Sequence, residues 1–342
     1  MCESMSIGSI CGPGADRAHT PSGSIIICTL NRADHLRQTL ASLARVHVPA
    51  DWDVELLVVD NGSTDDTEGV VTSSSIPGVH VHYHVEPHRG QCYARNKGLG
   101  LARGEIILFT DDDVRFPGHW LEEMCKPILG GQAKAVAGSI RIPESLLRPW
   151  VDDIHKSYYL ACEWWDVEHP HVMIGANMAF ARTVLEKVPA FDTELGPGAL
   201  GFGDDVLFSW QVEEAGFPIA SAGRGAAVEH HFDPSRLRRC ALLQRADQEG
   251  RVMAYQCFHW LHSRMKLPGL RGVLESAQLM ALRMLRQPGR AGDEGCPAWE
   301  LRLVTRIAFR QQFRRERRRP RAYDRRGLVK LSSTCGNTEA VQ

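Results

Sequence analysis

Short, continuous apolar runs recur along the first third of the chain, and each run ends abruptly in polar residues. They lie at Ser24–Leu30, Asp53–Val59 and Ile106–Phe109. Runs of this length without polar alternation are typical of strands that are buried on both faces of a parallel sheet. Between them, apolar positions recur with helical spacing, from Leu36 to Leu43 and within Gln91–Ala102. The alternation of strand and helix predicts a parallel sheet covered by helices.

The pattern is less regular through the middle of the chain. Val79–Val85 alternates valine or tyrosine with histidine, which predicts a strand at a sheet edge with one wet face. Histidines in such a row can bind a metal, but we favour a solvated face. Further strands are predicted at Ala135–Ile142, Val172–Phe180 and Val228–His231. One helix is expected to begin at Pro117, and another to run from Asp204 to Ala215 and to end at Gly216.

These elements predict an α/β fold with a Rossmann-like, mostly parallel sheet, flanking helices and a C-terminal helical extension. The expected boundaries are a disordered lead-in over 1–22, an α/β domain over 23–233, a basic helical extension over 234–330 and a flexible tail over 331–342. Amphipathic helices with many arginines are expected in the extension, interrupted near Pro268 and between Pro288 and Pro297.

Three adjacent carboxylates, Asp111, Asp112 and Asp113, follow the apolar run that ends at Phe109. At the carboxyl end of a parallel strand they would point into the crevice where open α/β sheets bind ligands. If the backbone stays extended, Asp111 and Asp113 face one side and Asp112 the other. From the residues alone, a site for a hard divalent cation and a solvated acidic turn have equal weight.

Composition and charge are those of an ordinary soluble globular protein. The 342 residues are 43% hydrophobic and 24% charged, with a net charge of −1. The ten cysteines include no Cys-x-x-Cys pair, which indicates reduced, intracellular cysteines. Because we find neither a secretory signal nor an apolar run of membrane-spanning length, we expect a cytoplasmic protein.

The near-neutral total conceals a basic C-terminal region. Ten arginines lie between Arg306 and Arg326, against only Glu316 and Asp324. Basic amphipathic helices suit either a solvated outer face or anionic lipid headgroups, so a peripheral contact on the inner face of the cell membrane stays open. Nucleic-acid binding ranks third because no recognisable module interleaves aromatic residues, and we expect no nucleic-acid partner.

Five separated motifs, taken together, resemble the family-2 glycosyltransferases. In order they are Cys28-Thr29-Leu30-Asn31-Arg32, Val58 to Asp65 (Val-Val-Asp-Asn-Gly-Ser-Thr-Asp), Ala94-Arg95-Asn96-Lys97-Gly98, Phe109-Thr110-Asp111-Asp112-Asp113, and Gly203-Asp204-Asp205 with Gly216 downstream. The resemblance covers about residues 23–232. It implies the GT-A fold, an inverting transfer, a nucleotide-sugar donor and a Mg²⁺ or Mn²⁺ cofactor.

The resemblance assigns the first half of the domain to the donor. Thr29, Asn31 and Asp60 would bind the nucleoside. Asp111 and Asp113 match the ends of an Asp-x-Asp motif and Asp112 its middle, and one of them would contact the ribose of the donor. Asp113 would bind the metal together with Asp111. Arg95 would contact the phosphates or form a helix-surface salt bridge, and His231 would be a third metal ligand or a structural histidine.

The second half would bind the acceptor. Asp205 matches the family's general base, which takes the proton of the attacking hydroxyl. Asp204 would position the acceptor or the base, and Asn177 matches a segment that lines the sugar pocket. Trp164 and Trp165 could stack on the acceptor or pack in the core. The glycine-rich loop at 196–203 would close over the bound donor and exclude water.

The favoured function is therefore a metal-dependent inverting glycosyltransferase. It would use a nucleotide-sugar, a UDP-sugar before a GDP-sugar, and a glycan or lipid-linked acceptor in polysaccharide, glycolipid or cell-envelope glycan synthesis. The alternatives are a nucleotidyltransferase and a non-catalytic sugar-nucleotide-binding protein. The first usually needs a glycine-rich basic phosphate loop, which the residues from Thr29 to Arg32 do not provide, and the second is disfavoured by the presence of Asp205.

Overall fold

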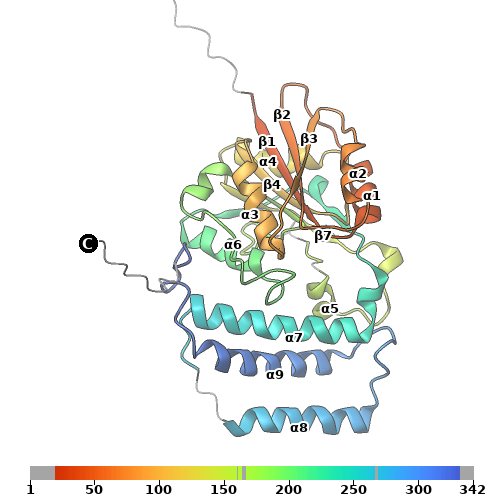
Figure 1. Cartoon of the computed structure of the whole chain (residues 1–342), viewed down its shortest axis with the longest axis vertical. Coiled ribbons are helices and arrows are strands. Elements are labelled where there is room, and N and C mark those ends of the chain that lie inside the picture. The colour runs from red at the N-terminus through yellow and green to blue at the C-terminus, as the bar shows by residue number, and fades with distance from the viewer. Residues whose placement is uncertain (1–19, 160, 164–166, 266–268, 332–342) are drawn as a thin grey trace, which may run out of the picture.

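A seven-stranded sheet forms the centre of the N-terminal part of the molecule (Figure 1). The computed structural model describes residues 20–331 apart from 160, 164–166 and 266–268. The strands are β1 (Ser22–Thr29), β2 (Asp53–Asp60), β3 (Val79–Val85), β4 (Ile106–Asp111), β6 (Ala135–Ala137), β8 (Asn177–Ala181) and β9 (Ile219–Ser221). Their spatial order is β3-β2-β1-β4-β8-β6-β9, and β8 is antiparallel to both its neighbours, so the sheet is mostly parallel, as expected.

The register of the parallel strands brings their polar ends together. Thr29 pairs with Asp60 across β1 and β2, and Cys28 pairs with Asp111 across β1 and β4. The carboxyl ends of these strands therefore share one edge of the sheet, as the apolar runs predicted. β3 lies at the outer edge beside β2, where the alternating valines and histidines indicated it would be.

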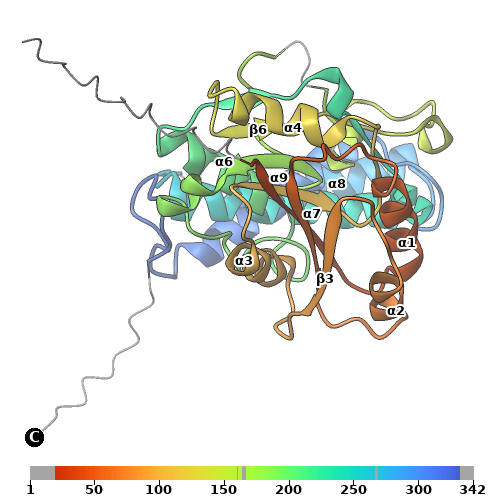
Figure 2. The ribbon, with the colours of Figure 1, turned by 90° about the horizontal axis from the view of Figure 1, so that it is seen from above.

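Helices cover both faces of the sheet. They are α1 (Ala33–Leu43), α2 (Thr67–Thr72), α3 (Gln91–Leu101), α4 (Trp120–Leu129) and α6 (Asp204–Glu214). α1, α2 and α4 pack against the face that carries Ile25 and Ile27, whereas α3 and α6 pack against the face that carries Ile26. Viewed from above, α3 lies across the sheet from α1 and α4 (Figure 2). Because both faces are buried, the central strands tolerate no polar alternation.

A second, three-stranded sheet lies beside the acidic end of β4. Its strands are β5 (Val114–Arg115), β7 (Ile140–Arg141) and β10 (Val228–His230), in the order β5-β10-β7. His230 pairs with Val114 in an antiparallel register. This pairing joins the end of β10 to Val114, the residue that follows the acidic triplet.

The C-terminal region is helical, as expected. α5 (Asp153–Tyr158) lies against it, and α7 (Arg239–Tyr255), α8 (Gly269–Arg286) and α9 (Ala298–Glu316) are stacked below the sheet. α7 faces the carboxyl ends of the strands, α9 packs on α7, and α8 is the outermost layer (Figure 1). None of the helices in the described part of the chain combines the length and apolar character needed to cross a bilayer.

Several boundaries differ from the sequence-based expectations. The region expected as one strand, Ala135–Ile142, is divided between two sheets, and Val172–Phe180 becomes a strand only from Asn177. Pro117 precedes α4, which begins at Trp120. The predicted lead-in and the tail beyond residue 331 lie almost entirely outside the described residues, although Ser22 already belongs to β1.

Candidate active site

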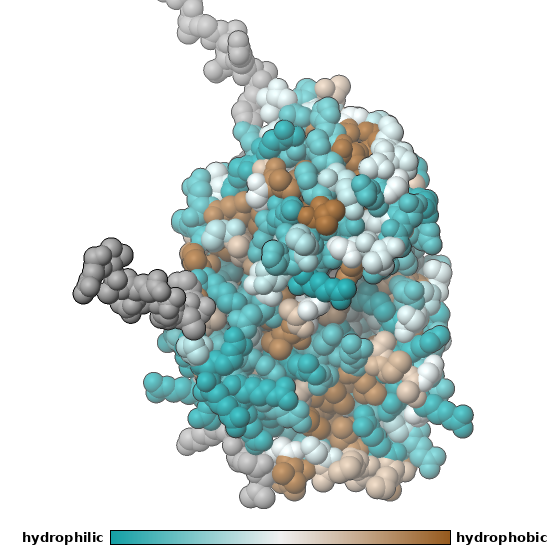
Figure 3. All heavy atoms as spheres, in the orientation of Figure 1, coloured by the Kyte–Doolittle hydropathy of each residue, from teal (hydrophilic) through white to brown (hydrophobic). Residues whose placement is uncertain are grey.

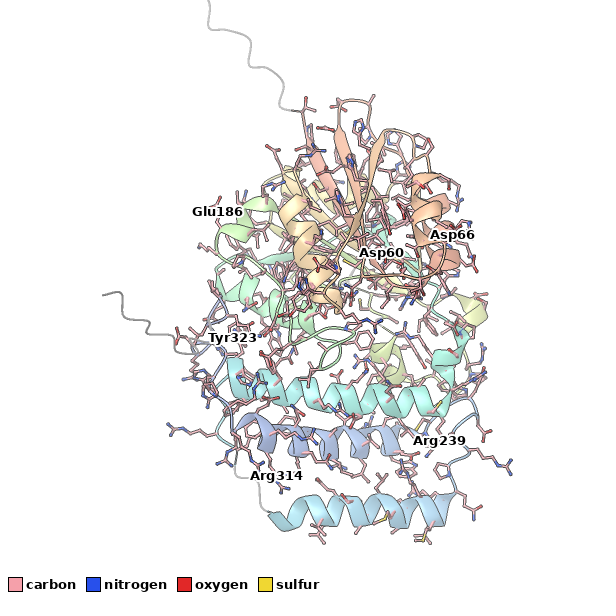
Figure 4. All side chains as sticks on the ribbon, viewed as in Figure 1. Asp60, Asp66, Glu186, Arg239, Arg314 and Tyr323 are labelled. Atoms are coloured by element: carbon pink, nitrogen blue, oxygen red, sulfur yellow. The ribbon has the colours of Figure 1, made fainter. Side chains whose placement is uncertain are left out.

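A cavity of about 540 Å³ opens at the carboxyl edge of the main sheet. Figure 4 labels Asp60 at the end of β2 that points toward α7, and the cavity lies between this edge and the α7 layer. Its size is typical of small-molecule sites. Four segments that were expected at the site line the cavity together: the end of β1, the start of α3, the acidic triplet and the start of α6. The predicted site residues among the lining are Thr29, Arg95, Asp111, Asp112, Asp113, Asp204 and Asp205.

The acidic triplet turns sharply after β4. Asp112 accepts a hydrogen bond from the hydroxyl of Thr29 at 2.7 Å, and its other oxygen lies 2.9 Å from a guanidinium nitrogen of Arg32. Asp113 contacts the other terminal nitrogen of the same guanidinium at 2.6 Å. Asp112 and Asp113 therefore share one partner, and the expected extended alternation of the triplet is wrong because the chain leaves the strand at Asp111.

The three carboxyl groups differ in their electrostatic environment. Burial raises the pKa of Asp112 to about 7, although Arg32 opposes the shift. Burial and the neighbouring Asp113 also raise the pKa of Asp111. Burial acts in the same direction on Asp113, but His230 and Arg32 outweigh it and hold the pKa of that carboxyl well below its ordinary range. Of the three carboxyl groups, Asp113 is the one whose ionised form the surroundings favour.

One oxygen of Asp113 is left without a partner. The side chain is 1% exposed, and its Oδ2 contacts both Arg32 and His230, whereas Oδ1 is buried without any hydrogen bond. A buried anionic oxygen without a partner carries a desolvation penalty that a bound cation would remove.

His230, and not the predicted His231, lies in the cavity. Its Nε2 is 3.3 Å from Asp113 Oδ2, and its Nδ1 is 2.8 Å from the backbone oxygen of Tyr159. The imidazole of His231 points the other way, toward Glu229 at 3.2 Å, and only its backbone N–H reaches Asp113. Successive side chains of β10 alternate between faces, so a shift of one position exchanges the inner residue for the outer one. The assignment of His231 to the metal is therefore wrong.

Asp205 is buried at the first turn of α6. Its Oδ2 accepts a hydrogen bond from the backbone N–H of Gly175 at 3.0 Å, and its Oδ1 accepts one from Val206 at 2.8 Å. Burial, together with the neighbouring Asp204, raises the pKa of Asp205 to about 6. A carboxylate with a pKa close to neutral, placed in a cavity, has the properties of a general base.

Arg95 forms a buried ion pair with Asp204. The guanidinium lies inside the protein, 5.3 Å from the ring centre of Phe191, so it makes no helix-surface salt bridge. Its pKa is raised above the ordinary value because the favourable charges of Asp204 and Asp205 exceed the cost of burial. Arg95 therefore joins α3 to the start of α6 and fixes the carboxylate next to Asp205.

Two predicted nucleoside-binding residues connect loops beside the cavity. Both oxygens of Asp60 accept hydrogen bonds, from the N–H of Ser63 at 2.8 Å and from the hydroxyl of Tyr83 at 2.7 Å. Asn31, which adopts a positive φ of 53°, accepts a hydrogen bond from the N–H of Thr64 at 2.7 Å. Neither side chain is among those that line the cavity.

Asn177 does not line the cavity. Its carboxamide is fully buried, accepting a hydrogen bond from the indole of Trp120 and donating to the backbone oxygens of Ser139 and Ala226. All the groups of the side chain have partners within the fold, so its predicted contact with the acceptor is wrong and its role is to join β8 to its surroundings. Trp164 and Trp165 lie outside the described residues.

Three arginines that carried no prediction also line the cavity: Arg32, Arg89 and Arg236. Arg32 was part of a recognised motif, so its proximity to the triplet could have been inferred. Arg236 follows β10, and its guanidinium lies 5.3 Å from the ring centre of Phe232, in a segment whose amphipathic pattern gives no direction. Together with Arg95, these side chains make the cavity suitable for anionic phosphate groups.

The glycine-rich loop at 196–203 closes one side of the cavity. Pro197, Gly198 and Phe202 belong to the lining, and the backbone oxygen of Pro197 accepts a hydrogen bond from the N–H of Gln91 at 3.0 Å. Gly196, with a φ of +87°, lies against Asp204, and a Cβ there would be 2.9 Å from the sulfur of Cys92. Glycine is therefore required where this loop passes the acidic pair.

A separate group with metal-ligand spacing occurs on the surface. Within the described residues, it is the only set of at least three His, Cys, Asp or Glu residues whose ligand atoms all lie within 4.8 Å of one another, and it consists of His47, His119 and Glu122. Hydrogen bonds from the two imidazoles to Glu122, at 2.7 and 3.3 Å, account for the grouping. None of the three lines the cavity.

Comparison with known proteins agrees with this arrangement. Residues 24–189 match the family model described as Glycosyl transferase family 2. This part of the chain belongs to glycosyltransferase family 2. The matched region contains the acidic triplet and the first four strands, whereas Asp205 and His230 lie beyond it.

The curated relatives of the chain are partial matches. Glucosyl-dolichyl phosphate glucuronosyltransferase of Haloferax volcanii is 26% identical over 182 residues, 51% of this chain and 56% of the relative. Validoxylamine A glucosyltransferase of Streptomyces hygroscopicus subsp. jinggangensis is 27% identical over 64% of this chain and 57% of its own length. Glycosyltransferase AglE of Haloferax volcanii is 31% identical over 59% and 64%. The chain thus spans 56 to 64% of the length of these relatives.

A solved structure with the same fold is that of the mannosyltransferase of Pyrobaculum calidifontis in complex with GDP-mannose and Mn²⁺. It superposes with a TM-score of 0.53 at 19% identity, over 86% of this chain and 76% of that one. The likeness confirms the GT-A fold that the motifs implied. At this identity it establishes the fold alone.

Proposed function

We propose that this protein transfers a sugar from a nucleotide-sugar donor to an acceptor hydroxyl with inversion, in a metal-dependent reaction. The observation that carries the proposal is that Asp113 and Asp205, from opposite halves of the domain, line the same cavity. A single displacement needs both a site for the departing diphosphate and a base for the attacking alcohol, within reach of one sugar.

The donor set suits a hard divalent cation. Asp113 offers a buried oxygen without a partner, Asp111 lies two residues before it, and His230 lies against it. These atoms do not form a closed three-ligand cage, which is expected for Mg²⁺ or Mn²⁺, since such ions take one or two carboxylates and fill the remaining positions with water and phosphate. When bound, the cation would neutralise the charge that develops on the nucleoside diphosphate.

Arg32 balances the negative charge of the acidic triplet. It contacts both Asp112 and Asp113, and its side chain is 31% exposed, so it has room to move toward solvent. A cation at Asp113 and the guanidinium of Arg32 would compete for the same negative charge. We therefore propose that Arg32 turns toward the donor phosphates when the site is loaded, and that Arg95 stays in place as the partner of Asp204.

Asp205 would act as the general base. Its pKa of about 6 leaves it ionised at neutral pH, yet basic enough to accept a proton from a hydroxyl as that hydroxyl attacks. The hydrogen bonds from Gly175 and Val206 hold the carboxylate in one orientation. The loop at 196–203 would exclude water, which competes with the acceptor for the donor sugar.

The identities of donor and acceptor follow from chemistry only as classes. Arg32, Arg89 and Arg236 suit a diphosphate, and a UDP-sugar remains our first choice over a GDP-sugar. For the acceptor, we propose a glycan or a lipid-linked sugar used in polysaccharide, glycolipid or cell-envelope synthesis. Its hydroxyl would enter on the side of the cavity formed by α6.

A donor screen that measures the release of nucleoside diphosphate tests the proposal. UDP- and GDP-sugars would be supplied with Mn²⁺ or Mg²⁺ to the wild type and to the Asp113→Ala, Asp205→Asn and Asp34→Asn variants. Asp34 is an exposed carboxylate on α1 and serves as the matched control. We expect release to be lost in the two crevice variants and retained in Asp34→Asn. Full activity of Asp205→Asn would rule out Asp205 as the general base, and full activity of Asp113→Ala would rule out Asp113 as the metal ligand.

A further inference from the structure

Helix α8 presents an apolar face to the outside of the molecule. It forms the outermost layer beyond α9 (Figure 1), and brown, apolar residues gather at that end of the surface (Figure 3). Five large apolar side chains on α8 are between 59% and 81% exposed, and they are Val273, Leu274, Met280, Met284 and Leu285. With 3.6 residues per turn, these five positions fall within an arc of about 140°, on one side of the helix.

The charged side of α8 faces the protein. Glu275 forms an ion pair with Arg310 of α9, with contacts of 2.6 and 3.2 Å, and both side chains are mostly buried. One turn before the helix ends, Arg283 donates to Glu300 at 2.6 Å. An ordinary surface helix turns its charges to water and its apolar stripe to the core. α8 has the opposite arrangement, which leaves an apolar stripe for a further partner.

Arginines lie near both ends of α8. Arg314 lies between α9 and the N-terminal end of α8, close to Gly272 (Figure 4). At the C-terminal end, Arg286 lies over the ring of Trp299 at 5.5 Å. Two further cavities, of about 470 and 350 Å³, are both lined by Arg264, which precedes α8 in the chain, and by Arg321, which follows α9. Between residues 264 and 326 the sequence has 17 Lys and Arg against six Asp and Glu, so the surroundings are strongly positive.

We propose that α8 docks this protein on an anionic lipid surface. The apolar face of α8 would enter the boundary between headgroups and acyl chains, and the arginines near its ends would bind lipid phosphates. A second copy of the chain is a poorer occupant, because a symmetric dimer through α8 would bring the two arginine-rich borders together. Charge complementarity therefore selects the bilayer.

The arrangement would orient the enzyme on the surface. α7 and α9 lie between α8 and the sheet, and the ion pairs of Glu275 and Arg283 connect α8 to α9. The catalytic cavity would thus be held on the far side of α7 from the lipid. This surface does not depend on the proposed chemistry, and it can be tested without a substrate.

Flotation of the full chain with lipid vesicles tests the proposal. Vesicles of phosphatidylcholine alone, and of phosphatidylcholine with phosphatidylglycerol, would be mixed with the wild type and with a Leu274→Gln/Met284→Gln/Leu285→Gln variant. We expect the wild type to float with the anionic vesicles, less so at high salt, and the variant to lose at least about tenfold in partitioning. The matched control is Val85→Gln/Leu129→Gln/Leu147→Gln, which alters three exposed apolar residues of the catalytic half.

Other outcomes would overturn the proposal. If the wild type stays with neither kind of vesicle, or if the control variant loses as much binding as the α8 variant, α8 is not the lipid-binding surface. Sedimentation without lipid distinguishes the remaining occupant. A wild-type dimer that the α8 substitutions dissociate, without vesicle binding, would assign the apolar face to a second copy. Arg286→Gln and Arg314→Gln should weaken binding to anionic vesicles and leave any dimer unchanged.

Discussion

The cavity at the sheet edge and the region around α8 both hold charged side chains in ion pairs, but they leave different groups without partners. In the cavity, Arg32 and Arg95 neutralise most of the carboxylates, and the group left over is a buried oxygen of Asp113. On α8, Glu275 and Arg283 are paired with α9, and the surface left over is apolar. The unpartnered oxygen of Asp113 suits a cation, whereas the apolar face of α8 suits a lipid surface.

The comparison shows why ion pairs alone are weak indicators of function. A buried pair compensates the desolvation of its own charges, and it adds little net stability to the fold. What identifies a site is the group that the pairs do not satisfy. In both regions, the paired residues hold the unpaired ones in a defined position.

Substitution of the base should give the largest effect on the cavity side. Asp205→Asn keeps the shape of the side chain but removes the proton acceptor, so transfer should fall by about 10²–10⁴-fold. Donor binding should change little because Asp205 is at the acceptor side. Initial rates at varied donor concentration would show a loss in kcat with an unchanged KM. A loss confined to KM would place Asp205 in donor binding instead.

The two adjacent histidines provide a sharper internal control. His230→Ala removes an imidazole that contacts Asp113, and we expect metal-dependent activity to fall by about 10–100-fold. His231→Ala removes a half-exposed ring beside Glu229 and should change activity less than about twofold. The activation constant for Mn²⁺, measured for both variants, would decide between them. Equal losses would show that β10 does not direct only His230 into the site.

The pKa of Asp205 predicts a pH dependence. The base acts only when ionised, so kcat/KM should rise by about tenfold between pH 5 and 7, with a midpoint near the pKa of about 6. Because this pKa lies above the ordinary value of 3.8, ionisation costs the folded state stability as pH rises toward and through 6. The Tm of Asp205→Asn relative to the wild type should therefore be higher at pH 8 than at pH 5. A pH-independent difference would contradict the raised pKa.

A polar cluster connects α7 and the C-terminal segment to the residues that precede the glycine-rich loop at 196–203. Buried Asp192 accepts hydrogen bonds from the hydroxyls of Tyr255 at 2.6 Å and Tyr323 at 2.8 Å, and from the ammonium of Lys330 at 2.5 Å. Tyr323→Phe removes one bond to a charged acceptor and should lower the free energy of unfolding by about 1–3 kcal/mol. Tyr93→Phe, at an exposed position, is the control, and equal midpoints in urea would show that the cluster contributes nothing.

The smallest expected effect concerns the attachment of α8. In Glu275→Gln, Arg310 loses its counter-charge but keeps a neutral acceptor, which should cost about 1 kcal/mol, or about fivefold in local opening. Hydrogen exchange of α8 amides should accelerate by that factor, while the amides of β1 and β2 stay unchanged. Acceleration in both regions would mean that α8 and the sheet unfold as one unit.

Much of the cavity could be predicted from sequence, for a simple geometric reason. Parallel strands end at one edge, so polar residues directly after buried runs must meet there, as Thr29 and Asp111 do. The prediction chose His231 instead of His230 because it followed the position of a metal ligand in related sequences. The alternation of side chains along β10 decides which histidine faces the cavity. Val228 and His230 are buried while Glu229 is exposed, and this period of two was readable in advance.

Two features could not be inferred from the sequence. Arg236 reaches the cavity from a segment after the last strand, where neither hydrophobic period nor turn chemistry fixes a direction. For α8, helical periodicity separates an apolar face from a charged face, but it does not tell which of them meets the protein. The ion pairs of Glu275 with Arg310 and of Arg283 with Glu300 show that the charged face is inward.

Calorimetric titration of the protein with a nucleoside diphosphate, with and without Mn²⁺, tests the central claim most directly. The wild type and Asp205→Asn should bind UDP or GDP tightly only when Mn²⁺ is present. Asp113→Asn should lose the metal-dependent part of the affinity. Binding by Asp113→Asn that is as tight and as metal-dependent as in the wild type would contradict the account, because the cation would then be held elsewhere.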